Sequence, residues 1–148
     1  MVTCHLGQAE DVLVHKLQKK EELPSLDEYY RLISAKTSSL LRMMVGMIGV
    51  VVRMSSKNLE IFYKVMNYVG ISFQITDDIL NLSRGMGKGI IAEDLHEKKF
   101  TIIIHFLRDH DEFMEEFIHP EKSDESIKRM LQIIEEKNVI PLCKNIAQ

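Results

Sequence analysis

The sequence predicts an all-α protein, and three observations support that fold class. The chain has 148 residues but only three Pro and seven Gly, so few residues interrupt long helices. Apolar side chains recur at helical spacing in residues 9–19 and 124–137. The one β-branched run, residues 101–104, has no second convincing strand to pair with, so we interpret it as part of a buried helix.

The first half of the chain contains three predicted helices. The first covers residues 9–19 and ends before Pro24. The second begins at Ser25, which forms a capping box with Glu28: the hydroxyl accepts from the amide three residues on, and the carboxylate reaches back. We expect this helix to run to about Val52, with a turn at 53–57. The third helix is predicted over residues 58–82.

The second half is less regular. A glycine-rich loop at 83–89 follows the third helix, and helical pattern resumes within 91–110. A turn at 120–123 precedes the amphipathic helix 124–137, and the tail after residue 138 is left unassigned.

Bulk composition is that of one globular domain spanning residues 1–148, with 45% hydrophobic and 28% charged residues. The net charge of -3 does not favour a nucleic-acid partner.

The longest uncharged apolar run, residues 43–52, is too short for a transmembrane segment, which needs about 20 residues. We interpret it as a buried core helix. Two cysteines without metal spacing and no visible signal peptide lead us to expect a cytoplasmic location.

The third predicted helix, which we expect to be buried, carries a polar stripe among otherwise apolar residues such as Phe73. Gln74, Asp77, Asp78 and Asn81 stand at i, i+3, i+4 and i+7, within one sector of the helix. Buried carboxylates need a partner, and carboxylate and amide oxygens suit a hard cation such as Mg²⁺. The alternative is that the acidic pair simply faces solvent on an amphipathic helix.

Several cations could meet an anion beside this stripe. Lys36 and Thr37 interrupt the apolar stripe of the second helix, where a lysine either reaches the helix edge or meets an anion. Lys88 lies in the glycine-rich loop, which is either a basic lid or a solvated linker, and Lys99 lies in a charged segment that could equally be an exposed turn. Metal-binding carboxylates with converging cations are what a diphosphate site requires.

These motifs follow one another in a characteristic order. They resemble the C-terminal half of the isoprenyl diphosphate synthases, or polyprenyl synthetases, and Asn81, where farnesyl-type enzymes usually have Asp, favours the eukaryotic geranylgeranyl diphosphate synthase type. The series runs Gly7-Gln8 with Asp11, Lys36-Thr37, Phe73-Gln74 with Asp77-Asp78 and Asn81, Lys88, Glu93-Asp94-Leu95, and Glu97 with Lys99-Phe100.

The resemblance implies an isoprenoid-synthase helical bundle around a deep cavity, usually in a homodimer. It implies a Mg²⁺-dependent prenyltransferase that joins isopentenyl diphosphate to an allylic diphosphate. By their positions in the family pattern, Asp77 and Asp78 are expected to bind the metal, and Thr37 and Gln74 to lie beside the reacting cation. The residues expected to hold the allylic diphosphate are Lys36, Lys88 and Lys99.

The sequence also departs from the family pattern. Ser38-Ser39 replace two glycines, Lys98 replaces a glycine, and Thr76 replaces an arginine. The family's first aspartate-rich motif, DDxxD, does not occur in the chain. We therefore expect a partial bundle that is inactive alone and acts in a homodimer or with the N-terminal half. The alternatives are a non-catalytic homologue that binds and modulates a full-length synthase, and a helical interaction domain whose Asp77/Asp78 stripe faces bulk water.

Overall fold

The computed structural model describes residues 2–14, 19–83 and 92–148, and over these residues every regular element is a helix. This confirms the predicted all-α fold class for the described part of the chain. In order, the elements are α1 (Val2–Val14), the 3₁₀ helix η1 (Lys20–Glu22), α2 (Leu26–Ile33), the π-helical turn η2 (Ser34–Ser38), α3 (Ser39–Val51), α4 (Ser56–Ser83), α5 (Glu93–His96), α6 (Ile102–Leu107), α7 (Asp111–Ile118), α8 (Asp124–Glu136) and α9 (Val139–Ala147).

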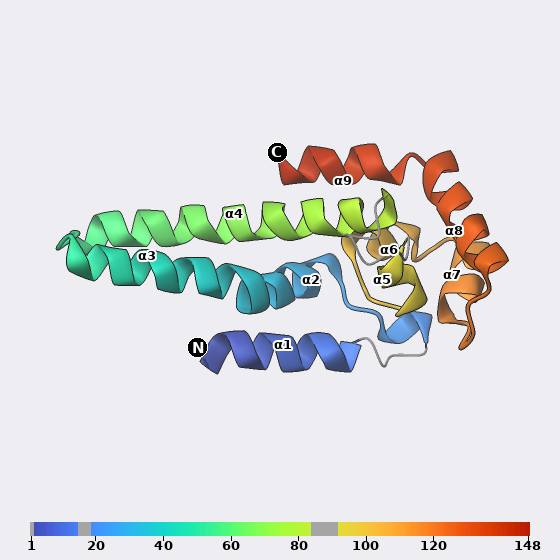
Figure 1. Ribbon diagram of the computed structural model, residues 1–148, viewed down its shortest axis with the longest axis horizontal. Helices are drawn as coiled ribbons and strands as arrows, with labels where there is room; N and C mark the ends of the chain where they lie inside the picture. The colour runs from blue at the N-terminus through green and yellow to red at the C-terminus, as the bar shows by residue number, and fades with distance from the viewer. Residues whose placement is uncertain (1, 15–18, 84–91) are drawn as a thin grey trace.

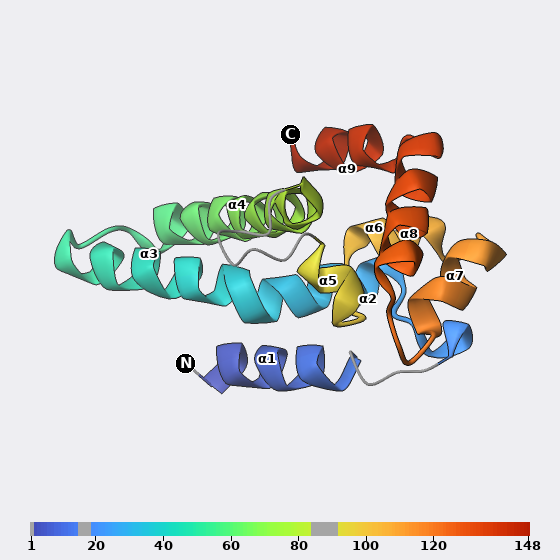
Figure 2. The ribbon, with the colours of Figure 1, turned by 45° about the vertical axis from the view of Figure 1, so that its right-hand side comes forward.

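A long antiparallel pair, α3 and α4, forms the axis of the molecule (Figure 1). Helix α1 lies along η2 on one side of this pair, and α9 lies along α4 on the other. The short helices α5 to α8 gather at the end remote from the α3–α4 turn, an arrangement also visible in Figure 2. Much of the apolar core lies at that end, where Ile104, Phe113, Met130 and Ile133 are fully buried.

The second predicted helix is confirmed, with one irregularity. The Ser25 hydroxyl accepts a hydrogen bond from the Glu28 amide at 3.3 Å, and the Glu28 carboxylate accepts from the Ser25 amide at 2.7 Å, which is the expected capping box. The helix then continues to Val51, but residues Ser34–Ser38 form a π-helical turn. A π turn accommodates one extra residue, so it changes which way the following side chains point.

The third helix is also confirmed, as α4, but the expectation that it is buried was wrong for much of its surface. Gln74, Asp78 and Asn81 lie on the buried face, whereas Phe73 is 64% exposed. The prediction that residues 43–52 form a buried core helix was likewise wrong: they are helical, but Val50 is 77% exposed. Apolar periodicity does not reveal which packing partners are present to cover a face.

The remaining elements differ from the predictions mainly at their ends. Helix α1 begins at Val2, earlier than predicted, and η1 precedes Pro24. The β-branched run lies in and beside α6 and is buried, as predicted. The unassigned tail forms α9. Among the described residues, none of the helices combines the length and the apolar character that a membrane span requires.

Candidate metal and diphosphate site

The π-helical turn holds Lys36 and Thr37 between two other helices. A Cβ placed at Gly7 of α1 would come within 2.7 Å of the Lys36 amide nitrogen, and one at Gly70 of α4 would come within 2.3 Å of the Ser38 Oγ atom. Glycine is therefore needed at both positions, because only the bare backbone permits this approach. The turn is fixed by close packing on both sides.

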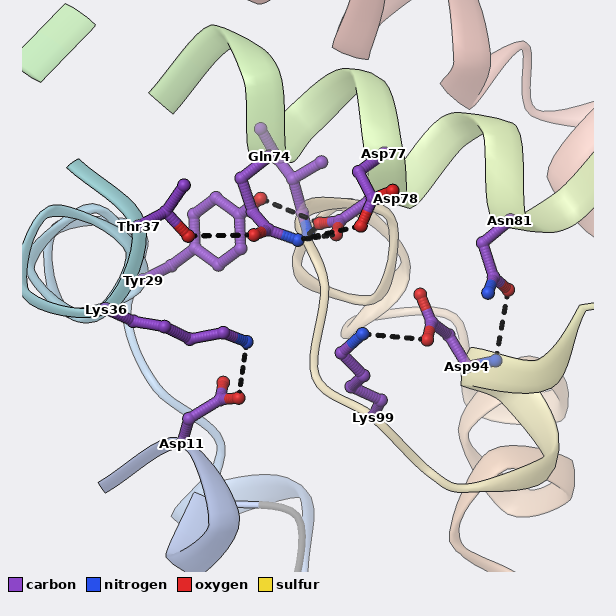
Figure 3. Close-up of polar contacts among 11 residues, drawn as sticks. Asp11, Tyr29, Lys36, Thr37, Gln74, Asp77, Asp78, Asn81, Asp94 and Lys99 are labelled. Carbon is purple, nitrogen blue, oxygen red and sulfur yellow. Dashed lines mark hydrogen bonds and ion pairs between the residues drawn. The ribbon is translucent and has the colours of Figure 1, made fainter. Parts of the chain in front are cut away.

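From this turn, Lys36 and Thr37 make separate polar contacts. The Lys36 Nζ atom lies 2.6 Å from Oδ2 of Asp11 in α1, in an ion pair that is largely shielded from solvent. The Thr37 hydroxyl donates to Oε1 of Gln74 at 3.0 Å (Figure 3). Two neighbouring residues of one turn thus link α1 and α4.

Asp78 is the buried carboxylate of the site, with only 2% of its surface exposed. Its Oδ2 atom accepts a hydrogen bond from the Tyr29 hydroxyl at 2.8 Å and a longer one from the Ile102 amide at 3.5 Å. Its Oδ1 atom accepts from the Gln74 side-chain amide at 2.9 Å. Burial raises the pKa of Asp78 to about 6, although the hydrogen bonds from Gln74 and Tyr29 act in the opposite direction.

Asp77 is placed differently from its neighbour. It is half-buried, and the same Gln74 nitrogen approaches its Oδ2 atom only to 3.4 Å. Adjacent residues on a helix point about 100° apart, so the two carboxylates face different surroundings. Asp78 is buried, whereas Asp77 keeps part of its surface in contact with solvent; Figure 3 shows both beside Gln74.

Asn81 continues the stripe and anchors the segment that carries Lys99. Its side-chain oxygen accepts from the Asp94 amide at 3.0 Å, at the start of α5. The Asp94 carboxylate in turn lies 2.9 Å from the Lys99 Nζ atom. Burial acts to lower the pKa of Lys99, but the hydrogen bond and charge of Asp94 outweigh it, and the pKa is raised.

The glycine that the family pattern places before this lysine is Lys98 here, and its backbone keeps the geometry typical of glycine. Lys98 has φ 54°, in the left-handed region. Its Nζ atom donates to the Ile118 carbonyl at 2.8 Å, at the end of α7. The chain thus retains the turn that directs Lys99 back toward α4.

Several of these side chains line a small cavity of about 20 Å³, which is room for about one water molecule. Its walls come from α1, α2, η2, α4 and the segment after α5, and its polar lining is Asp11, Tyr29, Lys36, Gln74, Asp78 and Lys99. Residues distant in the sequence therefore converge, as the candidate diphosphate site requires.

Most of the predicted site residues meet here, but not all can be placed. Lys36, Thr37, Gln74, Asp77, Asp78 and Lys99 gather around this cavity and the adjoining face of α4. Lys88 lies outside the described residues. The buried position of Asp78 contradicts the alternative in which the whole stripe faces bulk water.

Tyr29 was missed as a site residue. The sequence offered one signal, since a tyrosine on the apolar stripe of a helix needs a partner for its hydroxyl when it is buried. That partner is Asp78, 49 residues away.

The donor set fits a hard cation only in part. Carboxylate and amide oxygens are suitable for Mg²⁺. However, no group of three or more His, Cys, Asp or Glu side chains in the described ranges is arranged to hold a metal ion. Mg²⁺ commonly keeps several waters and binds through one or two carboxylates plus substrate phosphates, so Asp77 and Asp78 are compatible with part of such a site.

The polyprenyl synthetase family model matches residues 1–135 of this chain. The chain belongs to the polyprenyl synthetase family. A short chain isoprenyl diphosphate synthase of Methanocaldococcus jannaschii is 30% identical over 136 residues, covering 90% of this chain and 36% of that protein. A geranylgeranyl pyrophosphate synthase of Penicillium paxilli is 32% identical over 142 residues, covering 91% of this chain and 36% of that protein. The family resemblance found in the sequence is confirmed.

Solved structures show the same polyprenyl synthetase fold. Geranylgeranyl pyrophosphate synthetase from Pyrococcus horikoshii superposes with a TM-score of 0.80 at 22% identity, covering 98% of this chain and 45% of that one. Heptaprenyl diphosphate synthase from Staphylococcus aureus gives a TM-score of 0.83 at 20% identity, covering 99% of this chain and 46% of that one. The chain therefore spans a little under half of these structures and about a third of the two relatives.

Proposed function

We propose that this chain supplies the second aspartate-rich half of a trans-prenyltransferase active site, for the condensation of isopentenyl diphosphate with an allylic diphosphate. The observation that carries the proposal is the convergence of Lys36 and Lys99 with Gln74 and Asp78 around one cavity. Relatives named geranylgeranyl pyrophosphate synthases favour geranylgeranyl diphosphate as the product. In the same proposal, residues 1–148 form one domain, the C-terminal part of the fold.

The two aspartates have different roles in this proposal. Asp78 uses both oxygens for hydrogen bonds to Tyr29, Gln74 and the Ile102 amide, so it orients its surroundings. Asp77 is the carboxylate that offers oxygen to Mg²⁺. When bound, the metal neutralises charge on the departing diphosphate.

The lysines hold the allylic diphosphate in this proposal. Lys36 and Lys99 are now paired with Asp11 and Asp94, and these carboxylates occupy the positions that diphosphate oxygens would take. Lys88 is included by its position in the family pattern alone. The cavity must widen to admit a diphosphate, because its present volume suits about one water.

Gln74 and Thr37 act on the developing cation. The Gln74 nitrogen donates to Asp78, so its carbonyl oxygen points toward Thr37 and carries partial negative charge. As the allylic carbon–oxygen bond breaks, diphosphate leaves with the electron pair and an allylic cation forms. Oxygen dipoles held beside it lower the energy of that charge. The alkene of isopentenyl diphosphate then attacks, and a proton is lost.

The other half of the site comes from another polypeptide segment. No DDxxD motif occurs in this sequence, and the chain covers 36% of the first relatives. Exposed apolar side chains on α3 and α4, including Met47, Val51 and Phe73, support association with an N-terminal half or with a second copy. A non-catalytic partner of a full-length synthase would use the same surface. We also propose a cytoplasmic location, which agrees with two free cysteines.

Calorimetry and turnover assays test this proposal together. The purified chain with Mg²⁺ is expected to bind inorganic diphosphate, and Lys36→Met is expected to weaken that binding. With farnesyl diphosphate and isopentenyl diphosphate the chain alone should form no product. Adding the separately expressed N-terminal part of the Penicillium paxilli relative should restore product formation.

Each arm has an outcome that opposes the proposal. If the chain does not bind diphosphate, the proposed anion site is wrong. If the chain alone forms product, the proposal that it supplies only half of the active site is wrong. The chain and its Asp77→Ala variant are each added to the full-length relative. If both change the length of its product equally, the chain modulates a synthase and does not take part in catalysis.

A further inference from the structure

Every residue of the π-helical turn Ser34–Ser38 contacts another part of the fold. This is unusual for five consecutive helical residues, since a helix normally turns one side to solvent. The contacts are Ser34 with Arg42 and Asn67, Ala35 and Lys36 with Gly7, Thr37 with Gln74, and Ser38 with Gly70 and the Asn67 carbonyl.

The position of this π turn determines where Lys36 and Thr37 point. A π turn is one inserted residue, and the insertion can in principle lie elsewhere along the same helix. If the π turn moves along the helix, each residue over which it moves rotates by about 100° about the helix axis relative to the rest of the helix. A shift of the turn would therefore remove Lys36 from Asp11 and Thr37 from Gln74, although both residues would remain helical.

Arg42 binds the first residue of the turn in two ways. Its Nη2 atom donates to the backbone carbonyl of Ser34 at 3.3 Å, and its Nη1 atom donates to the Ser34 hydroxyl oxygen at 3.0 Å. A π turn interrupts the regular i→i+4 ladder of the helix, and Arg42 adds a side-chain donor to the carbonyl at its start.

Asn67 of α4 completes this cluster. Its Oδ1 atom accepts from Arg42 Nη1 at 2.5 Å and from the Ser34 hydroxyl at 2.5 Å, while its backbone carbonyl accepts from Ser38 Oγ at 3.0 Å. Arg42, Ser34 and Asn67 thus connect the beginning and the end of the π turn to one point of α4.

The cluster lies away from the candidate site. Ser34, Arg42 and Asn67 line a separate surface pocket of about 300 Å³ together with Tyr63 and Tyr68, and none of these residues lines the cavity of Lys36 and Gln74. Arg42 therefore acts on the site indirectly, through the backbone of η2 and through Asn67 of α4.

We propose that Arg42 is a positioning residue, which with Ser34 and Asn67 holds the π turn in register and so aims Lys36 and Thr37 at the site. Its consequence for ligand binding rests on the proposed function. Its consequence for the direction of Thr37 does not.

Nuclear magnetic resonance of the labelled chain tests the direction of Thr37 without any ligand. In the wild-type chain, cross-peaks are expected between the Thr37 methyl group and the Gln74 side chain. Arg42→Met should lose them, and Arg42→Lys, which keeps the charge and one donor at a time, should retain them in part. Arg129→Met is the matched control, because Arg129 pairs with Glu112 on the remote α7–α8 surface, and it should keep the cross-peaks.

Calorimetry with Mg²⁺ and inorganic diphosphate tests the consequence for binding. Arg42→Met should weaken binding by about 10- to 100-fold, the scale found when a residue that orients a metal-binding side chain is removed, applied here to Lys36. Arg129→Met should bind as the wild-type chain does. Thermal unfolding of each variant shows whether it is folded during the measurement.

Persistence of the Thr37 cross-peaks in folded Arg42→Met overturns the proposal, even if that variant melts at a lower temperature. Unchanged affinity in a variant that has lost the cross-peaks overturns the functional consequence. If wild-type chain does not bind diphosphate, the proposed function fails, and the cross-peaks still decide the role of Arg42. If Arg42→Met does not fold, Arg42→Lys and Asn67→Ala undergo the same two measurements.

Discussion

The hydroxyl of Tyr29 in α2 donates a 2.8 Å hydrogen bond to Oδ2 of Asp78 in α4, and both side chains are almost fully buried. The bond joins the helix that leads into the π turn to the helix that carries the polar stripe. Tyr29 also packs edge-on against Phe100, with ring centroids 6.2 Å apart, next to Lys99. One tyrosine thus connects three segments of the site.

Removal of this hydroxyl should destabilise the fold. Tyr29→Phe leaves Oδ2 of Asp78 with only the long bond from the Ile102 amide, so we expect a loss of about 1–3 kcal/mol in the free energy of unfolding. Urea unfolding measures this loss. Tyr30→Phe is the matched control, because the Tyr30 hydroxyl makes no hydrogen bond among the described residues, and it should change stability little. Equal effects of the two substitutions would contradict the prediction.

The stability of the protein should depend on pH through Asp78. Its pKa rises from 3.8 to about 6 on folding, because burial disfavours the charged form. The folded state therefore holds more protons than the unfolded state between these values. This contribution to stability is fully present below pH 3.8 and is lost as the pH rises to about 6, by at most about 3 kcal/mol.

Asp78→Asn isolates this contribution. The variant cannot titrate at position 78, so the difference in unfolding free energy between wild-type and variant should change across pH 4 to 6 and stay constant above it. Chemical unfolding at a series of pH values gives both curves. Parallel curves across that window would show that Asp78 does not titrate as expected.

Lys98 should tolerate glycine better than alanine. Its backbone has φ 54°, which suits glycine, while its side chain donates to the Ile118 carbonyl. Lys98→Ala keeps the strained backbone and loses the bond, so it should cost about 1 kcal/mol. Lys98→Gly loses the same bond but relieves the strain, so it should recover part of that loss. Urea unfolding of both variants tests the order, and a less stable glycine variant would contradict it.

Gly70 and Ser38 should behave as a coupled pair. A Cβ at Gly70 would meet the Ser38 Oγ atom at 2.3 Å and its Cα atom at 2.7 Å. Gly70→Ala should therefore destabilise the chain by about 1–3 kcal/mol, despite the better helix propensity of alanine. Ser38→Gly removes the nearer of these two contacts and should rescue part of the loss. A double-mutant cycle measures the coupling, and strictly additive effects would refute it.

Local sequence signals predicted the regular parts of the fold well. The capping box at Ser25 and Glu28 and the spacing of Gln74, Asp78 and Asn81 are local patterns, and both appear in the structure. The burial of Val50 and Phe73 was predicted wrongly. Helical periodicity identifies an apolar face, but only a packing partner removes that face from water.

The sequence by itself determined the all-α class, the main helices, the family and the candidate residues on α4, because helix formation and motif order are encoded in neighbouring residues. Only the tertiary structure decided that Ser34–Ser38 form a π turn, that Tyr29 binds Asp78, and that Asp77 and Asp78 have different surroundings. The π turn contacts Gly7, Gly70, Arg42 and Asn67, and Tyr29 reaches Asp78 across 49 residues of sequence. Such contacts join residues far apart in the chain, and local propensity carries no information about them.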